Sequence, residues 1–129
     1  MAPTFNAIGL AAEDMPATLD FYRALGLSIP PEQDKEPHAE AVLPGGIRLM
    51  FDSWASLRSL DPDWTPGEPG GGLAFLCENA AEVDTVHAAL VNAGYRSHKE
   101  PWDAVWGQRY AQVLDPDGRV VDLFAWLNG

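Results

Sequence analysis

The chain has 129 residues, of which 47% are hydrophobic, so it is long and apolar enough for one domain with a buried core but short for two. Its 19 acidic residues outnumber its 8 basic residues and give a formal net charge of -11. This charge repels phosphate backbones and anionic lipid headgroups, so nucleic acid and membranes are not expected partners, whereas cationic small molecules are attracted.

The expected location of the protein is the cytoplasm. Residues 1–4 show no basic segment followed by an apolar run, and no apolar run approaches the length of a membrane span. The single cysteine, Cys77, cannot form an internal disulfide or a thiolate metal cluster, and it follows the apolar stretch 73–76. We therefore expect a buried and unreactive thiol.

The first half of the chain is predicted to form one strand, one helix and three further strands. Asp14 is placed to cap the helix and Gly26 to end it, and the Gly45-Gly46 pair marks a hairpin turn. The predicted elements are strands over residues 5–12, 27–30, 38–43 and 47–52 and a helix over residues 15–25.

Residues 53–71 are predicted to connect the two halves without regular structure, because Pro62, Pro66, Pro69 and the glycine run 70–72 interrupt them. The order of elements then recurs. Gly94 is placed to end the second helix, and the segment 115–118, Asp-Pro-Asp-Gly, to form the last turn. The predicted elements are a helix over about residues 81–93 and strands over residues 73–78, 96–99, 109–114 and 119–127.

The two halves align with each other, which indicates an internal duplication of about 70 residues. Aligning the helices places Gly26 on Gly94, and aligning the hairpins places Gly46 on Gly118. The sequence therefore predicts an α+β fold within one domain, 1–129, with halves of about 4–53 and 72–128. Each half is a βαβββ module, a curved mixed sheet with a helix on its outer face, and the two modules form a cleft.

Three segments carry a resemblance to a known family. They are 8–14 with 18–27, from Ile-Gly-Leu through Thr-Leu-Asp-Phe-Tyr-Arg-Ala-Leu-Gly-Leu; 45–51, Gly-Gly-Ile-Arg-Leu-Met-Phe; and 106–124, from Trp-Gly-Gln-Arg-Tyr-Ala through Asp-Pro-Asp-Gly to Asp-Leu-Phe. In this order and spacing the chain resembles the glyoxalase/bleomycin resistance protein/dioxygenase (vicinal oxygen chelate) superfamily over nearly its whole length. The resemblance implies the same paired βαβββ fold.

The metal enzymes of that family bind a divalent ion through four side chains, two from each half, usually His or Glu. In this chain the four positions fall on Ala7, Met50, Gly72 and Asp122. Ala7 and Gly72 offer no side-chain donor, whereas such ions need three or four imidazole or carboxylate ligands. We therefore expect no metal site of the family type and no cofactor.

Side chains alternate between the two faces of a strand, so residues in phase with those four positions are predicted to face the cleft. Ile47, Leu49, Phe51, Val121, Leu123 and Leu127 are predicted to face the core. Trp54, Trp64 and Trp102 are placed in loops that flank the cleft. The candidate ligand-binding residues are His38, Glu40, Arg48, Met50, Asp52, Trp106, Tyr110, Gln112, Asp122, Phe124 and Trp126.

These residues give a cleft with large aromatics, carboxylates and one Arg, which suits a planar or cationic ligand. For any one aromatic a structural role is the more common one, and Trp126 could pack at a dimer interface. Asp122 needs a partner, because a carboxylate in an apolar cleft is costly without one: Arg48, a ligand cation or solvent. His87 and His98 are expected to be ordinary structural residues, whereas His38 with Glu40 could handle a proton.

The leading hypothesis is a metal-independent binding protein of the bleomycin-resistance type that sequesters an aromatic or cationic compound, with an antibiotic as one candidate. The resemblance to that branch implies a homodimer. The alternative is a glyoxalase-like lyase, isomerase or dioxygenase that uses a divalent metal through Asp122, Glu40 and His38. A metal-free enzyme with His38 or Asp122 as a base is a third hypothesis, and the sequence assigns no catalytic residue.

Overall fold

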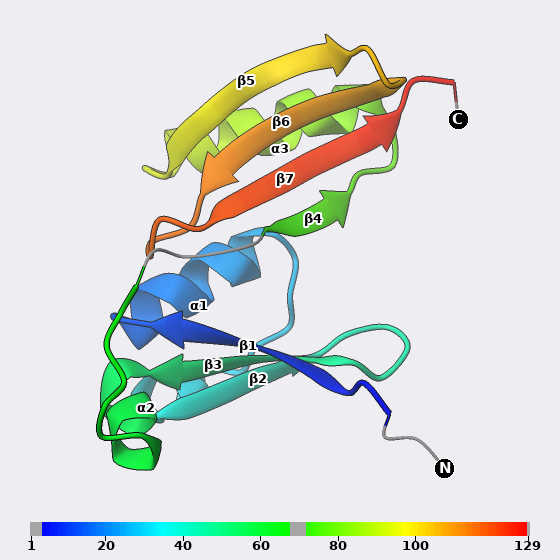
Figure 1. The fold of residues 1–129 in the computed structure, drawn as a ribbon. Helices are drawn as coiled ribbons and strands as arrows, with labels where there is room; N and C mark the ends of the chain where they lie inside the picture. The colour runs from blue at the N-terminus through cyan, green and yellow to red at the C-terminus, as the bar shows by residue number, and fades with distance from the viewer. Residues whose placement is uncertain (1–3, 68–71, 129) are drawn as a thin grey trace. The chain divides into compact units, whose positions relative to one another are not determined.

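The computed structural model of the chain describes residues 4–67 and 72–128 and has the predicted α+β fold, with two modules that each contain a mixed sheet; the first has one strand fewer than the predicted βαβββ order (Figure 1). The chain divides into two compact units, residues 1–68 and 69–129. The elements of unit 1 are β1 (Ala7–Ala12), α1 (Met15–Ala24), the 3-10 helix η1 (Pro31–Lys35), β2 (His38–Val42), β3 (Arg48–Ser53) and α2 (Trp54–Leu60). The elements of unit 2 are β4 (Leu73–Leu76), α3 (Ala80–Asn92), β5 (Arg96–Ala104), β6 (Gln108–Leu114) and β7 (Val120–Trp126).

Unit 1 is a three-stranded mixed sheet in the order β1-β3-β2. β1 runs parallel to β3, and β2 runs antiparallel to it. The core lies where α1 packs against this sheet: the rings of Tyr22 in α1 and Phe51 in β3 are fully buried, with centroids 5.2 Å apart. α1 begins where predicted, because the Asp14 side chain accepts a hydrogen bond from the backbone of Ala17.

The strand predicted at 27–30 does not form. Arg23 explains why, because its guanidinium donates to the backbone oxygens of Ile29 and Pro30 at 2.8 and 3.0 Å. Those oxygens are the acceptors that a strand would need to join a sheet, and proline at positions 30 and 31 removes two backbone donors. The segment instead leads into η1, and the sheet of unit 1 has one strand fewer than predicted.

The predicted connector contains a helix, α2, which corrects the expectation that 53–71 lacks regular structure. Ser53 caps α2, its hydroxyl accepting from the backbone of Ser56 at 3.1 Å. The first proline of the segment, Pro62, comes only after α2 has ended, so the prolines break the chain later than expected. Four connector residues, 68–71, lie outside the described part of the chain.

Unit 2 is a four-stranded mixed sheet in the order β4-β7-β6-β5, and α3 packs against β5, β6 and β7. Asn79 caps α3 by accepting from the backbone of Glu82 at 2.8 Å, while the Glu82 carboxylate accepts from the backbone of Glu78 at 3.0 Å. β5 is longer than the predicted 96–99 and contains two register shifts against β6. It therefore includes Trp102, which was predicted to lie in a loop.

The internal duplication is visible in the backbone of the two units. The helix ends match, since Leu27 donates to the Tyr22 oxygen and Tyr95 to the Leu90 oxygen, each at 3.1 Å. Both helices are followed by a glycine with a φ of 99°. The hairpin turns match as well, with the pairs 43/47 and 115/119 joined by backbone bonds of 2.8 and 2.9 Å. Corresponding residues of the two units are 68 positions apart at the helix ends and 72 positions apart at the hairpin turns, as the sequence alignment predicts.

The alternation of faces follows the prediction along both hairpins. The side chains that pack beneath the helices are buried: Ala39, Ala41, Leu49 and Phe51 in unit 1, and Ala111, Val113, Val121, Leu123 and Ala125 in unit 2. Leu127 is an exception, with 39% of its surface exposed, because β7 ends at Trp126 and the two-residue period ends with it. Cys77 is buried as expected, and burial raises the pKa of its thiol.

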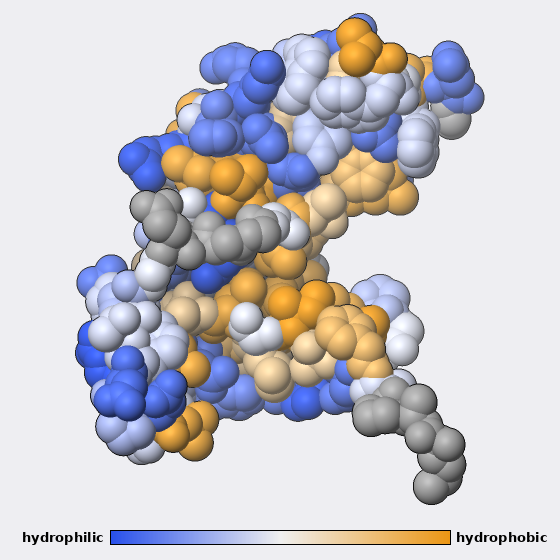
Figure 2. Space-filling model, viewed as in Figure 1, coloured by the Kyte–Doolittle hydropathy of each residue, from blue (hydrophilic) through white to orange (hydrophobic). Residues whose placement is uncertain are grey.

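β1 and β4 are edge strands of their respective sheets and are apolar in sequence. Figure 2 shows hydrophobic side chains gathered along each of these strands. Among the described residues, no helix is long and apolar enough to cross a membrane.

Candidate functional site

The candidate residues lie on two sheet surfaces, one in each unit. The charged face is the side of β2 and β3 that carries His38, Glu40, Arg48, Met50 and Asp52. The aromatic face is the side of β5, β6 and β7 that carries Trp102, Tyr110, Gln112, Asp122, Phe124 and Trp126, together with Trp106 in the adjoining turn. In each unit the opposite side of the same strands is the buried one.

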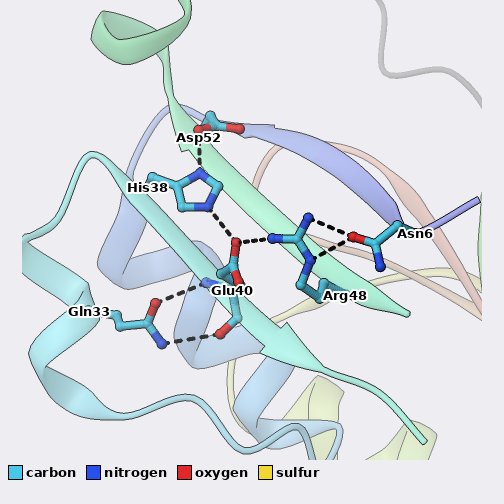
Figure 3. A network of polar contacts seen from close by, with 6 residues as sticks. All are labelled: Asn6, Gln33, His38, Glu40, Arg48 and Asp52. Carbon is cyan, nitrogen blue, oxygen red and sulfur yellow. Dashed lines mark hydrogen bonds and ion pairs between the residues drawn. The ribbon is translucent and has the colours of Figure 1, made fainter. Parts of the chain in front are cut away.

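The charged face contains one continuous polar network (Figure 3). Arg48 Nη1 donates to Glu40 Oε2 at 2.7 Å, and the same carboxylate oxygen lies 2.8 Å from His38 Nε2. His38 Nδ1 lies 2.7 Å from Asp52 Oδ1. The imidazole thus bridges two carboxylates, one from its own strand and one from β3.

This geometry favours the charged form of His38. A neutral imidazole can donate from only one nitrogen, whereas both nitrogens here contact carboxylate oxygens. Glu40 and then Asp52 raise the pKa of His38 above its usual 6.5, while His38 and Arg48 lower the pKa of Glu40. An imidazolium with both N–H groups engaged is poorly suited to accept a proton or to ligate a metal ion.

Exchanging Glu40 for Gln should lower the pKa of His38, because the exchange removes the hydrogen bond that contributes most to raising it. A group with a raised folded-state pKa stabilises the fold fully below its unfolded value near 6.5 and loses that contribution as pH rises through the folded value. NMR titration of the His38 ring protons measures this, with the exposed His98 recorded in the same spectra as a reference. A wild-type His38 that titrates at or below 6.5 would contradict the charged bridge.

Two residues of the network were not predicted. Asn6 Oδ1 accepts from Arg48 Nε and Nη2 at 3.1 and 2.8 Å, which orients the guanidinium. The Gln33 amide pairs with the backbone of Glu40 at 2.9 and 3.1 Å, so it satisfies the outer edge of β2 as a neighbouring strand would. Neither contact could be read from strand phase, because Asn6 precedes β1 and Gln33 lies in η1.

Five aromatic rings form the aromatic face. Trp102 contacts Trp106 and Tyr110, with centroids 6.1 and 5.6 Å apart, and Trp106 lies 5.5 Å from Tyr110. Tyr110 stacks on Phe124 at 6.1 Å, and Phe124 meets Trp126 edge to face at 6.4 Å. More than half of the surface of Trp106 and of Trp126 is exposed. The rings therefore form a continuous surface that other molecules can reach.

Asp122 is the carboxylate of the aromatic face, and its described partners are neutral. The Tyr110 hydroxyl donates to Asp122 Oδ2, and Gln112 Nε2 donates to Oδ1 at 3.0 Å. Burial and the contact with Asp122 raise the pKa of Tyr110 to about 12, so the phenol remains a proton donor at neutral pH. The two donors orient the carboxylate but leave its negative charge uncompensated.

The remaining candidates are placed as follows. Met50 lies across from Gly9 in β1, where an added β carbon would meet the Met50 methyl group at 3.8 Å. Trp106 Nε1 donates to Gln108 Oε1 at 2.8 Å. The rings of Trp54 and Trp64 are tilted against each other, with centroids 6.1 Å apart, and the Arg58 guanidinium lies 5.7 Å from each ring. His87 is buried and lies 2.8 Å from the Ser97 hydroxyl, a structural contact.

The four family positions do not provide a metal site in this chain. Ala7 lacks a donor and pairs in register with Arg48, whose positive charge opposes a cation there. Gly72 lacks a donor as well, Met50 offers only a thioether, and both Asp122 oxygens accept hydrogen bonds. Within residues 4–67 and 72–128, no group of three His, Cys, Asp or Glu side chains is arranged to hold a metal ion.

The chain matches the family described as Glyoxalase/Bleomycin resistance protein/Dioxygenase superfamily over residues 4–123. A comparison with curated proteins found no match.

Solved structures of similar fold cover almost the whole chain. A glyoxalase/bleomycin resistance protein/dioxygenase from Nocardioides is 24% identical over 100% of this chain and 87% of its own, with a TM-score of 0.75. A glyoxalase-related enzyme from Fulvimarina pelagi is 21% identical over 96% of this chain and 88% of its own, with a TM-score of 0.82. A lactoylglutathione lyase from Agrobacterium tumefaciens is 20% identical over 97% of this chain and 95% of its own, with a TM-score of 0.70. At these identities the likeness establishes the fold.

Proposed function

Because the chain belongs to the glyoxalase/bleomycin resistance protein/dioxygenase superfamily, we propose that it works as a metal-independent binding protein of the bleomycin-resistance type. It sequesters an aromatic or cationic small molecule, with planar cationic antibiotics as the first candidates, and does not transform it. We propose that it does so as a cytoplasmic homodimer. The observation that carries the proposal is the aromatic face around Asp122.

The aromatic face supports binding by stacking. Trp106 and Trp126 expose 56% and 57% of their surface, and both contact further rings of the face. Large apolar side chains in water favour a partner that covers them, and flat ring surfaces favour a planar partner. A ligand with a conjugated ring system matches both requirements.

The charge of the site supports a cation. Asp122 lies among the rings and its hydrogen-bond donors are neutral, so its carboxylate can attract a ligand cation. The rings add cation–π attraction, and the net charge of -11 draws cations toward the protein as a whole. A neutral planar molecule would gain only the stacking part.

The alternative, a lyase, isomerase or dioxygenase with a divalent metal, requires donors that the family positions lack. Its proposed ligand His38 has both ring nitrogens on carboxylates, and Glu40 already binds Arg48. A lactoylglutathione lyase is among the similar structures, but at 20% identity it supports the fold and not the reaction.

Titrating the protein with a panel of planar and cationic antibiotics, followed by tryptophan fluorescence, tests the proposal. At least one cationic member should quench the emission with saturation. Asp122→Asn should weaken that ligand about tenfold or more, because the exchange removes a charge-assisted contact but keeps the size of the side chain. Asp63→Asn is the matched control, because Asp63 is an exposed carboxylate in the other unit. This exchange should leave the affinity for the ligand unchanged. Absence of quenching by every member would refute the proposal.

A further inference from the structure

Lys99 lies in the same cross-strand row as the carboxylate of the aromatic face. The register pairs Lys99 with Gln112, and Gln112 with Asp122. The next row joins Trp102, Tyr110 and Phe124 in the same way. A register shift between Lys99 and Trp102 marks a bulge in β5, and bulges redirect side chains.

The Lys99 ammonium lies over an aromatic ring. Its Nζ atom is 4.3 Å from the centroid of the Trp102 ring, well within the range of cation–π attraction. Among the ion pairs of the described residues, none joins Lys99 to a carboxylate. The indole and solvent therefore stabilise the charge.

We propose that Lys99 is a tethered competitor that occupies the cation position on Trp102 until an organic cation displaces it. This inference rests on the proposed function, since it concerns the same face and the organic cations proposed to bind there. A bound cation must replace the ammonium on the indole, and it is also repelled by the ammonium while the lysine remains nearby. Neutral planar ligands bear no such repulsion.

Lys99→Met tests the proposal, because methionine keeps an unbranched apolar chain and removes the charge. We expect a roughly two- to fivefold tighter affinity for a cation, the range of an exposed cation–π contact. The probe is (4-hydroxyphenyl)trimethylammonium, compared with its neutral isostere 4-tert-butylphenol, with fluorescence excited at 295 nm. Lys35→Met controls for net charge, because Lys35 is the other of the chain's two lysines and lies in unit 1. This variant should bind both probes with the affinity of the wild type.

The contact itself is measured without ligand. The ring current of Trp102 should shift the Lys99 ε-methylene protons upfield in the NMR spectrum, and Trp102→Leu should abolish that shift. Lack of the upfield shift in the wild type overturns the inference, whatever the probes do.

The titrations separate the two proposals. Equal affinity of the wild type and Lys99→Met for the ammonium probe, or an equal gain for both probes, overturns the competitor role but leaves the proposed function standing. A gain confined to the ammonium probe supports both. If no variant binds either probe, and no member of the antibiotic panel quenches the tryptophan emission, both proposals are overturned.

Discussion

Asp115→Ala is expected to destabilise the protein by about 3–5 kcal/mol, the range for removing one partner of a buried ion pair. The Asp115 carboxylate is inaccessible to solvent, and Oδ2 lies 2.5 Å from Nη1 of the nearly buried Arg119. Oδ1 also accepts from the backbone of Asp117 and of Arg119, at 3.0 and 2.8 Å. One side chain thus fixes the turn between β6 and β7, the strands that carry Tyr110 and Asp122.

Urea unfolding followed by circular dichroism measures the loss. Asp115→Asn should fall between wild type and alanine, because asparagine keeps an oxygen acceptor for the backbone but lacks the charge. Asp63→Asn, an exposed carboxylate, should stay within about 0.5 kcal/mol of wild type. A loss below about 1 kcal/mol for Asp115→Ala would show that the turn does not depend on this pair.

Phe51→Ala should cost about 3–5 kcal/mol, because it leaves a cavity in the core of unit 1. The Phe51 ring is fully buried between sheet and helix, 5.2 Å from the Tyr22 ring, which in turn meets Phe21 edge to face at 5.0 Å. Phe51 lies on the side of β3 opposite to the charged face, so the expected effect is on stability and not on ligand contacts.

Met50→Ala is the matched comparison for Phe51→Ala. Met50 is the neighbouring residue in β3, points to the opposite side of the sheet and is only partly buried. Truncation of Met50 should lower the free energy of unfolding clearly less than truncation of Phe51 in the same experiment. Of the two residues, only Met50 belongs to the candidate site. Equal losses for the two variants would contradict the assignment of faces.

Local signals in the sequence were sufficient to predict most of the architecture. The helix boundaries follow from Asp14 and from Gly26 and Gly94, whose φ of 99° is a conformation that glycine adopts without strain. The face of each hairpin residue follows from a period of two, because that period is a property of the strand itself. Because the two hairpins align with each other, the face assigned to a residue in one hairpin predicts the face of the corresponding residue in the other.

Features that depend on long side chains were not predictable. Arg23 takes the backbone oxygens that the strand at 27–30 would have used, and its choice of partners depends on the fold. The bulges of β5 place Trp102 on the aromatic face, and bulges have no clear signal in a sequence with scattered charges. The roles of Lys99, Asn6 and Gln33 were not predicted either, because their side-chain contacts also depend on the fold.

For the candidate site, strand phase predicts which residues share a face but not the partners of their side chains. The sequence offers Arg48 as one partner of Asp122, whereas in the structure Arg48 binds Glu40 and Asn6. Asp122 instead accepts from Tyr110 and Gln112. This difference matters because a carboxylate with neutral partners retains its attraction for a ligand cation.

Metal-independent binding is the central claim, and calorimetric titration of chelator-treated protein tests it most directly. The ligand is the antibiotic that quenches tryptophan emission most strongly in the untreated protein. The account predicts the same affinity and stoichiometry before and after treatment, because stacking on the aromatic face and attraction to Asp122 need no ion. Heat that vanishes after chelation and returns with added zinc, nickel, manganese or iron would contradict it.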